Sequence, residues 1–299
     1  NTISDCEQTG ICGSMGGAFS EIYGNHIYNI LCKQQYGGAE MAGIKLHGAI
    51  DTYIHNNRIH KCGCYGLWLD WMAQGARVSS NLFYDNSWYD LFTEVQHGPI
   101  IVDNNILLSQ SSVQENADGI AYVHNLFAGC FRGMDDERYV PYHLNHSTEI
   151  KGFKSIVHGD HRFYNNIFMG GKNNKAQYGL KGYQTASWPI FAEGNLFCNN
   201  AQPAKEGQGE VLSVTVPDIQ IEETANEVYL ILPDETNHLS EITTQPVDAA
   251  RLGKARLSNY CFANPDGTPV NLGKDYFGKI RSGHFTTGPI QQINEKRIK

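Results

Sequence analysis

The sequence has few charged residues and lacks the features of several common protein classes. Only 18% of its 299 residues are charged, and no apolar run approaches the ~18 residues that a membrane-spanning helix needs. Helical heptads and a Leu-x-x-Leu frame are absent, which argues against coiled-coil and leucine-rich repeat architectures. The net charge is −8, so we expect neither nucleic acid nor a membrane as a partner. A neutral ligand fits this composition better.

The eight cysteines do not form a paired framework. Their positions, 6, 12, 32, 62, 64, 130, 198 and 261, indicate reduced and mostly buried thiols rather than a disulfide scaffold. Cys62 and Cys64 lie close to His60, but a zinc site normally needs a second such pair at a suitable distance. We therefore expect no metal and no other cofactor.

What the sequence does contain is an internal repeat. Asn followed by apolar side chains recurs at Asn1, Asn25, Asn57, Asn81, Asn105, Asn125, Asn166 and Asn195, with gaps of 24, 32, 24, 24, 20, 41 and 29 residues. A unit of this length cannot bury its own apolar face, so successive copies must stack. The repeat predicts an all-β protein, a right-handed parallel β-helix with one copy per coil. We expect the Asn side chains to occupy one turn of each coil, with left-handed backbone and hydrogen bonds to the copies above and below.

The repeat ends after Asn200, which suggests two parts. We predict β-helix coils over residues 1–200 and a β-rich segment over 201–299 that caps the open end of the helix and packs along it. Because residue 1 is Asn and already lies within a repeat, we expect the natural chain to begin further upstream. The longest gap contains a polar stretch from Cys130 to His161, and loops of this kind on a rigid scaffold often form one wall of a site.

Two strands with the same pattern end in carboxylates. The stretches from Leu67 to Asp70 and from Leu91 to Glu94 alternate residue by residue, and their carboxylates are 24 positions apart, as are the repeats around them. Since adjacent strands lie about 4.8 Å apart, two such side chains on one face should be roughly 5 Å apart. Retaining glycosidases hold their carboxyl groups about 5–5.5 Å apart, and like charges this close raise one pKa. We predict Asp70 and Glu94 as the catalytic pair.

Neighbouring residues supply candidates for substrate contact. Trp68 and Phe92 alternate onto the same outer face and would offer apolar surfaces to a sugar ring. His47 matches Asp70 in the preceding coil, and His97 lies in the turn after Glu94. We expect His47 and His97 to contact the substrate.

Several stretches around these residues resemble those of a known enzyme family. The motifs WLDWMAQG at 68–75, LFTEVQHGP at 91–99 and GAEMAGIKLHGAID at 38–51 resemble glycoside hydrolase family 120, β-xylosidases with a parallel β-helix core. The ending NPDGTPVNLGKDYFGKIRSG is similar to the C-terminal portion of that family.

The resemblance implies exo-acting, retaining hydrolysis of terminal β-linked xylose, with Asp70 as nucleophile and Glu94 as acid/base. Glu40, His47 and Trp68 would contact the substrate. The expected partner is a small oligosaccharide. The family's amino-terminal coils and β-sandwich insertion have no counterpart in this sequence, so we also expect the chain either to self-associate as a homo-oligomer or to associate with that missing N-terminal part.

Two other functions stay open from the sequence. A β-helix polysaccharide lyase or polygalacturonase could recruit Lys45, Arg132 or Lys154, although the clustered carboxylates of a calcium-dependent lyase are not evident. A non-catalytic carbohydrate-binding module would bind sugar without hydrolysing it.

Overall fold

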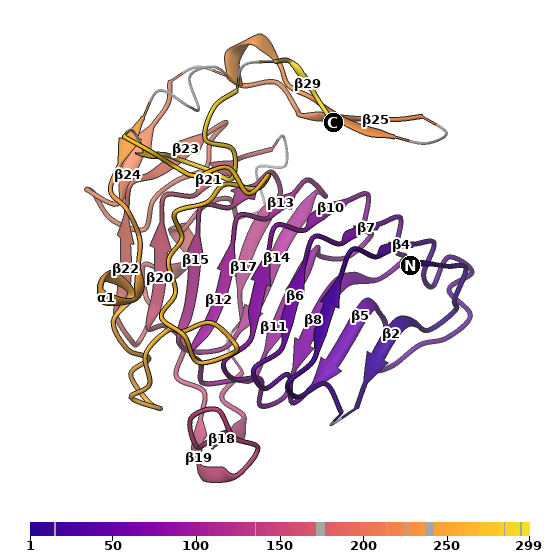
Figure 1. Cartoon of the computed structure of the whole chain (residues 1–299), viewed down its shortest axis with the longest axis vertical. Coiled ribbons are helices and arrows are strands. Elements are labelled where there is room, and N and C mark those ends of the chain that lie inside the picture. Colours follow the sequence, from indigo (N-terminus) through magenta and orange to yellow (C-terminus); the bar gives the residue numbers. More distant parts are fainter. Residues whose placement is uncertain are drawn as a thin grey trace.

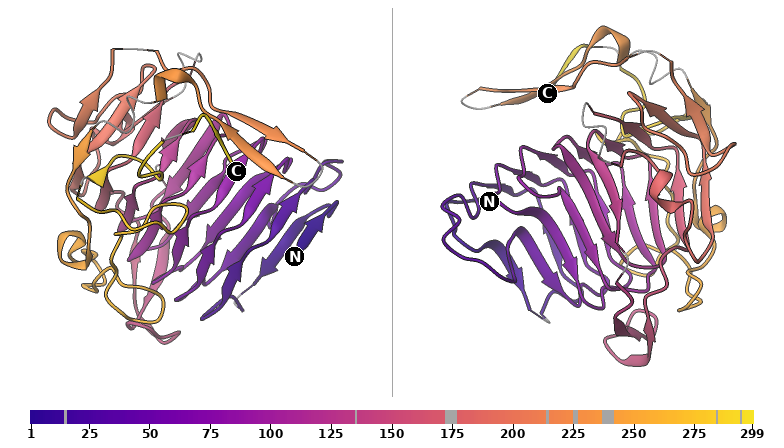
Figure 2. Two further views of the ribbon diagram at one scale, coloured as in Figure 1. Left: turned by 45° about the horizontal axis from the view of Figure 1, so that its top comes forward. Right: turned by 180° about the vertical axis from the view of Figure 1, so that it is seen from behind.

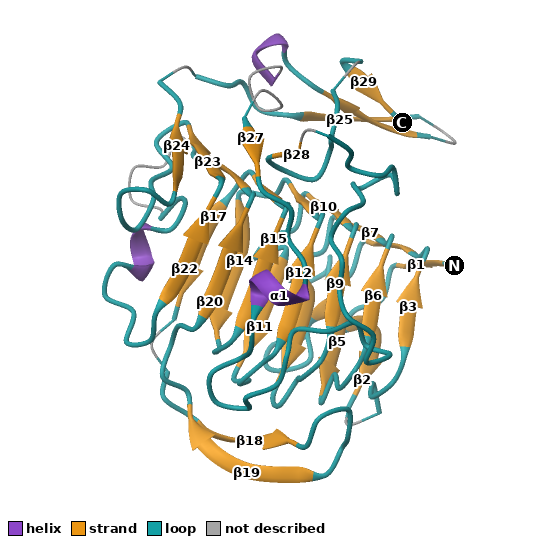
Figure 3. Ribbon diagram, turned by 60° about the vertical axis from the view of Figure 1, so that its left-hand side comes forward, coloured by secondary structure: helices purple, strands orange, loops and turns teal. Residues whose placement is uncertain are grey.

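The chain folds as a parallel β-helix in which each full coil contributes one strand to each of three parallel sheets (Figures 1 and 3). The computed structural model describes residues 1–14, 16–134, 136–171, 177–213, 215–224, 227–236, 242–283, 285–293 and 295–299. Sheet A contains β1 (Thr2–Ser4), β4 (His26–Tyr28), β7 (Arg58–His60), β10 (Leu82–Tyr84), β13 (Ile106–Leu107), β16 (Leu126–Phe127), β21 (Ile167–Met169), β23 (Asn195–Cys198) and β24 (Gly209–Val211). Sheet B contains β2 (Thr9–Gly13), β5 (Ala42–His47), β8 (Tyr65–Asp70), β11 (Leu91–Glu94), β14 (Ser111–Asn116) and β17 (Cys130–Gly133). Sheet C contains β3 (Glu21–Tyr23), β6 (Tyr53–His55), β9 (Arg77–Ser79), β12 (Ile100–Asp103), β15 (Ile120–Val123), β20 (His161–Tyr164) and β22 (Ile190–Glu193).

The repeated asparagines form a continuous hydrogen-bonded ladder at the turn between sheets C and A. From Asn25 to Asn195, each side-chain amide donates to the side-chain oxygen of the next Asn at 2.9–3.0 Å. The predicted ladder is therefore confirmed. The left-handed backbone, however, belongs to the residue before each Asn, with φ of 52° at Asn56, 54° at Ser80 and 53° at Asn104. This turn leads the chain from sheet C into sheet A, and the ladder pairs the buried Asn side chains there.

Alternation along the strands sends one set of side chains into the coil, where they form the core. Stacked rings fill its later coils, with Phe127, Phe168 and Phe197 at successive centroid distances of 5.1 Å. The predicted register of sheet B is confirmed, since Leu67 pairs with Ile44 on one side and with Leu91 on the other. Removal of this apolar surface from water is the main force that stacks the coils.

The C-terminal segment packs along the outside of the helix (Figure 2). Phe262 and Val270 cover the outer face of sheet C against Ile101, and Leu230 covers that of sheet A beside Leu82. This segment contains α1 (Ala249–Leu252) and two small antiparallel sheets, made of β25 (Gln220–Glu223), β26 (Val228–Ile231) and β29 (Arg297–Ile298), and of β27 (Thr243–Thr244) and β28 (Phe285–Thr286). The coils extend beyond the expected boundary at residue 200, because β24 still pairs in parallel with β23.

The polar stretch in the longest repeat interval forms a hairpin of β18 (Tyr139–His143) and β19 (Ile150–Ser155). It projects from the turn that follows sheet B (Figure 1). A 3₁₀ turn, η1 (Lys181–Tyr183), follows β21. Within the described ranges, no helix has both the length and the apolar character needed to cross a membrane.

Candidate active site

Four polar residues form one row where the strands of sheet B end. His47 pairs with Asp70, and Glu94 pairs with Asn116, while Leu69 and Thr93, the residues just before Asp70 and Glu94, pair with each other. Residues in register on neighbouring parallel strands point to the same face. The two predicted catalytic carboxylates therefore occupy adjacent rungs, next to the hairpin.

The Asp70 carboxylate is bound by two basic side chains and one amide. Lys45 Nζ donates to Oδ2 at 2.6 Å, His47 Nε2 lies 2.7 Å from the same oxygen, and the Trp71 backbone N–H donates to Oδ1 at 2.6 Å. Burial raises the pKa of Asp70, but the hydrogen bond and charge of Lys45, followed by the charge of His47, outweigh burial and lower it. Asp70 is thus held ionised.

Lys45 links three of the predicted site residues. Its side chain is fully buried, and its ammonium lies 3.1 Å from Glu40 Oε2 as well as 2.6 Å from Asp70. It also sits 3.7 Å from the centroid of the Trp68 ring, a cation–π contact. Glu40 in turn lies 3.6 Å from His47 Nε2. The structure brings Glu40 and His47 together around Asp70.

Glu94 has a different set of neighbours. The Trp68 indole N–H donates to Oε2 at 2.9 Å, and Arg138 forms an ion pair with Oε1. Burial raises the pKa of Glu94; the Arg138 guanidinium opposes this, but the adjacent Asp70 carboxylate raises it further, and the net result is a pKa above the ordinary value. The two neighbouring carboxyl groups therefore shift in opposite directions, which suits one for nucleophilic attack and the other for proton donation.

The aromatic side chains of this face are more enclosed than alternation alone suggests. Trp68 is 9% exposed and Phe92 is 4% exposed. Their rings stack 5.2 Å apart, and Tyr65 covers both. The expectation that these two rings offer open faces to a sugar is therefore wrong, and Trp68 instead reaches the site through its indole N–H. The exposed indole beside Asp70 is that of Trp71, at 40%.

The structure buries the His97 side chain under the hairpin. The side chain is 2% exposed, with Nδ1 lying 3.1 Å from Asp118 and Nε2 lying 3.0 Å from the backbone oxygen of Lys154 in β19. Both ring nitrogens are engaged in the protein, so His97 has no group left to offer a sugar. It anchors the hairpin instead, which corrects the sequence-based prediction.

The hairpin is fastened to the loops that directly follow the two carboxylates. The Gln74 side chain accepts a hydrogen bond from the backbone N–H of His143 at 3.0 Å and donates to its carbonyl at 3.1 Å. Val95 packs against Val140 and Ile156. The hairpin thus lies beside the carboxylate row as a fixed element.

Two residues of this site, Arg138 and Trp71, are not predicted by the sequence pattern, and a third, Lys45, differs from its expected role. Arg138 lies in the interval that has no counterpart in other repeats, so no alignment of coils could place it. Trp71 stands inside the predicted motif, and its unusual backbone, with φ of 20°, is invisible in the sequence. Lys45 was considered only as a lyase base, whereas its ammonium is bound to two carboxylates.

No group of three or more His, Cys, Asp or Glu side chains suited to a metal ion is found in the part of the chain that the structure describes. Cys62 and Cys64 are buried in the helix core, and His60 points out of sheet A to stack on Tyr84 at 4.4 Å. The side chains of Cys62, Cys64 and His60 therefore do not point toward a common site.

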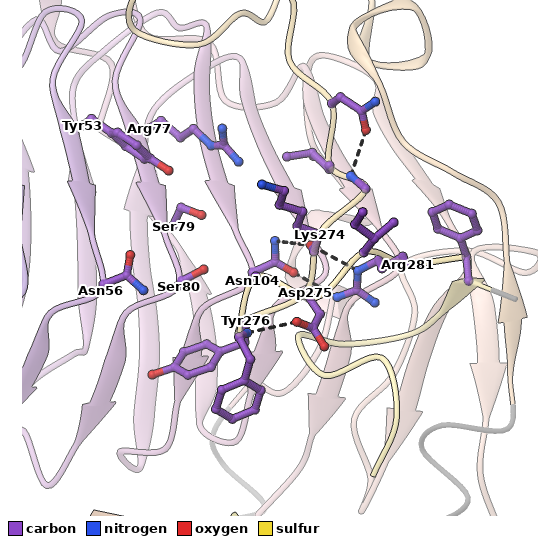
Figure 4. Close-up of a pocket in the computed structure, with 17 residues that line it drawn as sticks. Tyr53, Asn56, Arg77, Ser79, Ser80, Asn104, Lys274, Asp275, Tyr276 and Arg281 are labelled. Carbon is purple, nitrogen blue, oxygen red and sulfur yellow. Dashed lines mark hydrogen bonds between the residues drawn. The ribbon is translucent and has the colours of Figure 1, made fainter. Parts of the chain in front are cut away.

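A large groove lies on another sheet. It measures about 1000 Å³ and runs between the outer face of sheet C and residues 271–281 (Figure 4). Its polar groups are joined to each other, since Arg77 binds Asp103 at 2.8 and 2.9 Å and Arg281 donates to Asn104 at 2.9 Å. The Arg281 bond attaches the C-terminal segment to the coils, whereas the Arg77 bonds join two coils, and the groove does not include the carboxylate pair.

Comparisons with known proteins agree with this architecture. Residues 1–128 match the model of a right-handed β-helix region. Over 99% of its length, the chain is similar to XylC, a protein whose structure was determined in complex with xylose. The two share 39% sequence identity with a TM-score of 0.91, and the match covers 50% of XylC, so this chain spans about half the length of that protein. No curated protein sequence matches.

Proposed function

We propose that the protein is a retaining β-glycoside hydrolase that releases terminal xylose from short xylo-oligosaccharides. The observation that carries this proposal is the pair of adjacent carboxyl groups whose pKa values move apart, Asp70 downward and Glu94 upward. Similarity to a protein solved with xylose supports the choice of sugar. The resemblance of the central motifs to family 120 β-xylosidases supports the exo-acting mode.

In this mechanism, Asp70 attacks the anomeric carbon while Glu94 protonates the departing glycosidic oxygen. The product of this step is a glycosyl ester of Asp70 and an ionised Glu94. Glu94 then takes a proton from water, which attacks the same carbon and releases Asp70. Lys45 and His47 keep Asp70 ionised and hold its Oδ2 in place at 2.6 and 2.7 Å.

Substrate contacts would come from the open side of this cluster. The Glu40 side chain is 28% exposed and that of His47 is 21% exposed, which leaves both able to meet sugar hydroxyls. The Trp71 indole offers an apolar face beside the nucleophile. A lyase would instead need a base that is free to reach the substrate, and Lys45 Nζ is engaged by Glu40 and Asp70.

Replacement of each carboxylate tests the assignment. Asp70→Asn should reduce hydrolysis of 4-nitrophenyl β-xyloside by about 10⁴-fold or more, because the nucleophile is lost. Glu94→Ala should accumulate a glycosyl adduct with a 2,4-dinitrophenyl xyloside, which azide should release as the β-xylosyl azide. Early NMR spectra of the wild-type reaction should show β-xylose. Near-normal activity of Asp70→Asn, or α-xylose as the first product, would refute the proposal.

A further inference from the structure

Arg138 stands directly before the hairpin and binds the predicted acid/base. Its guanidinium forms an ion pair with Glu94 Oε1, while its Nε lies 2.8 Å from Asp136. The side chain is 44% exposed, so it approaches Glu94 from the solvent side. The hairpin that follows is anchored through His97 and Gln74, which fixes the backbone from which Arg138 extends.

The contact between Arg138 and Glu94 opposes the first step of the proposed mechanism, in which Glu94 must be protonated. A guanidinium has only donors, so it stabilises the ionised form of a carboxyl group. Ionised Glu94 cannot donate a proton in the first step, but it is the form required to accept one from water in the second. The contact therefore favours the second step.

The other groups around Glu94 show how the balance changes between the steps. Asp70 faces it from β8 and Tyr65 lies on the same sheet face, and both the Asp70 charge and burial favour the protonated form. Asn116 is in register with it from β14 and carries no charge. From the hairpin side come Arg138 and, bound to Arg138, Asp136. Among the residues that the structure describes, Glu94 thus has Asp70 as its anionic neighbour and Arg138 as its cationic neighbour.

Formation of the glycosyl–enzyme removes the anionic neighbour. When the bond from Asp70 to the anomeric carbon forms and the glycosidic bond breaks, the Glu94 proton leaves with the alcohol and Asp70 becomes a neutral ester. Arg138 is then the dominant charge beside Glu94. When water attacks, its proton passes to Glu94 and the Asp70 carboxylate reappears, which again favours protonated Glu94.

We propose, on the basis of the function proposed above, that Arg138 is a positioning residue that stabilises ionised Glu94 in the glycosyl–enzyme and so prepares it to act as the general base. Arg138 does not touch the reacting atoms; it acts through Glu94.

Arg138→Met tests this proposal because the two steps should respond differently. With 2,4-dinitrophenyl β-xyloside, whose leaving group needs no acid, kcat should fall about 10- to 100-fold as the second step slows. Mass spectrometry of the intact protein during turnover should show a larger fraction of glycosyl–enzyme. With xylobiose, the alkaline limb of the kcat/KM profile should move to higher pH, because loss of the cation leaves Glu94 protonated further up the pH scale.

Two further variants serve as controls. Arg138→Lys retains a cation and should restore most of the alkaline limb toward its wild-type position. Lys151→Met removes a positive charge from the same hairpin, where Lys151 binds the Ser258 carbonyl at 3.3 Å, and should leave both profiles unchanged. Thermal unfolding of each variant establishes that it is folded.

An equal loss with both substrates, with no movement of the alkaline limb and no added glycosyl–enzyme, would overturn the role of Arg138. That result is distinguishable from failure of the proposed function, because azide rescue of Glu94→Ala depends on the carboxylate pair and not on Arg138. A shift of the alkaline limb to lower pH in Arg138→Met would also contradict the proposal, because it would mean that Arg138 stabilises protonated Glu94.

Discussion

Two turns of the coil carry one row of residues each, and the rows differ in what they repeat. At the turn between sheets C and A, the row repeats Asn, and every rung makes the same hydrogen bonds at 2.9–3.0 Å. At the turn after sheet B, the row reads His47, Asp70, Glu94 and Asn116. The first row is uniform and neutral, whereas the second changes residue, charge and partners at each step.

The difference indicates a division of labour within a single scaffold. In the uniform row, each coil pairs its buried Asn side chain with that of the next coil, so every added coil gains the same stabilising hydrogen bonds. The varied row holds two carboxylates in fixed register beside the buried Lys45. Such an arrangement suits the proposed chemistry, although burying these charges costs desolvation energy. Mutations in the uniform row should therefore affect stability, and mutations in the varied row should affect catalysis.

After loss of the catalytic pair itself, the largest expected effect comes from removing the buried Lys45 ammonium beside the varied row. Lys45→Met leaves Asp70 without the donor at 2.6 Å, and we expect kcat/KM at neutral pH to fall about 10³-fold, or about 4 kcal/mol. The pKa of Asp70 is lowered chiefly by Lys45 against the effect of burial, so its loss raises that pKa. Since Asp70 must be ionised to attack, the acidic limb of the pH profile should move to higher pH.

The matched control for this variant is Lys61→Met, which removes a lysine paired with Glu223 at 3.0 Å outside sheet B. Its pH profile should be that of the wild type. An acidic limb that stays in place in Lys45→Met would contradict the assignment of Asp70 as the group whose ionisation controls activity at low pH.

A smaller effect, on stability alone, is expected in the uniform row. Asn105 is fully buried; its side chain accepts from the Asn81 side chain at 2.9 Å and donates to the Val78 carbonyl at 2.9 Å. Asn105→Ala removes these bonds and the acceptor of the buried Asn81 backbone N–H, and we expect the free energy of unfolding to fall by about 2–4 kcal/mol. Chemical denaturation measures the loss, while kcat at a temperature where the variant is folded should change little.

Asn271→Ala provides the comparison at the surface. This exposed side chain accepts one hydrogen bond, from the Gly273 N–H at 2.9 Å, and its loss should cost about 1 kcal/mol or less. Equal destabilisation by the two variants would show that the ladder contributes no more than an ordinary turn.

The same contrast explains what could be read from the sequence. The uniform row appears in the amino-acid sequence as a recurring Asn, so the spacing of Asn predicts both the β-helix and its ladder. The register of sheet B also followed, because counting from each carboxylate to the next Asn aligns the strands. Both features depend on contacts between equivalent positions of neighbouring coils, which a repeat encodes directly.

The errors concern contacts that no repeat encodes. His97 resembled a site residue, but its partners Asp118 and Lys154 come from the next coil and from an inserted hairpin. Alternation placed Trp68 on the outer face correctly, yet it could not show that Tyr65 would cover it. Arg138 lies in the insertion, where only the folded hairpin brings it to Glu94.

The smallest expected effect concerns the backbone conformation directly after Asp70 in the varied row. Asp70 is followed by two non-glycine residues with positive φ, Trp71 at 20° and Met72 at 64°, a conformation that is uncommon for large side chains and is often found at functional sites. It turns the Trp71 N–H onto Asp70 and leaves the indole 40% exposed. We infer that the strain is retained because it directs the Trp71 N–H to Asp70 and keeps the indole exposed.

Trp71→Ala and Trp71→Gly separate these contributions, because both keep the backbone N–H and remove the indole. We expect KM for xylobiose to rise about fivefold in both variants, with kcat nearly unchanged, since stacking on an aromatic face contributes about 1 kcal/mol. Trp71→Gly should be more stable to denaturant than Trp71→Ala by about 1 kcal/mol, because glycine adopts positive φ without strain. If KM does not change while the stability order holds, the indole has no part in sugar binding and the turn exists to orient Asp70. If alanine is as stable as glycine, the turn carries no strain, and the varied row then differs from the asparagine row in its side chains alone.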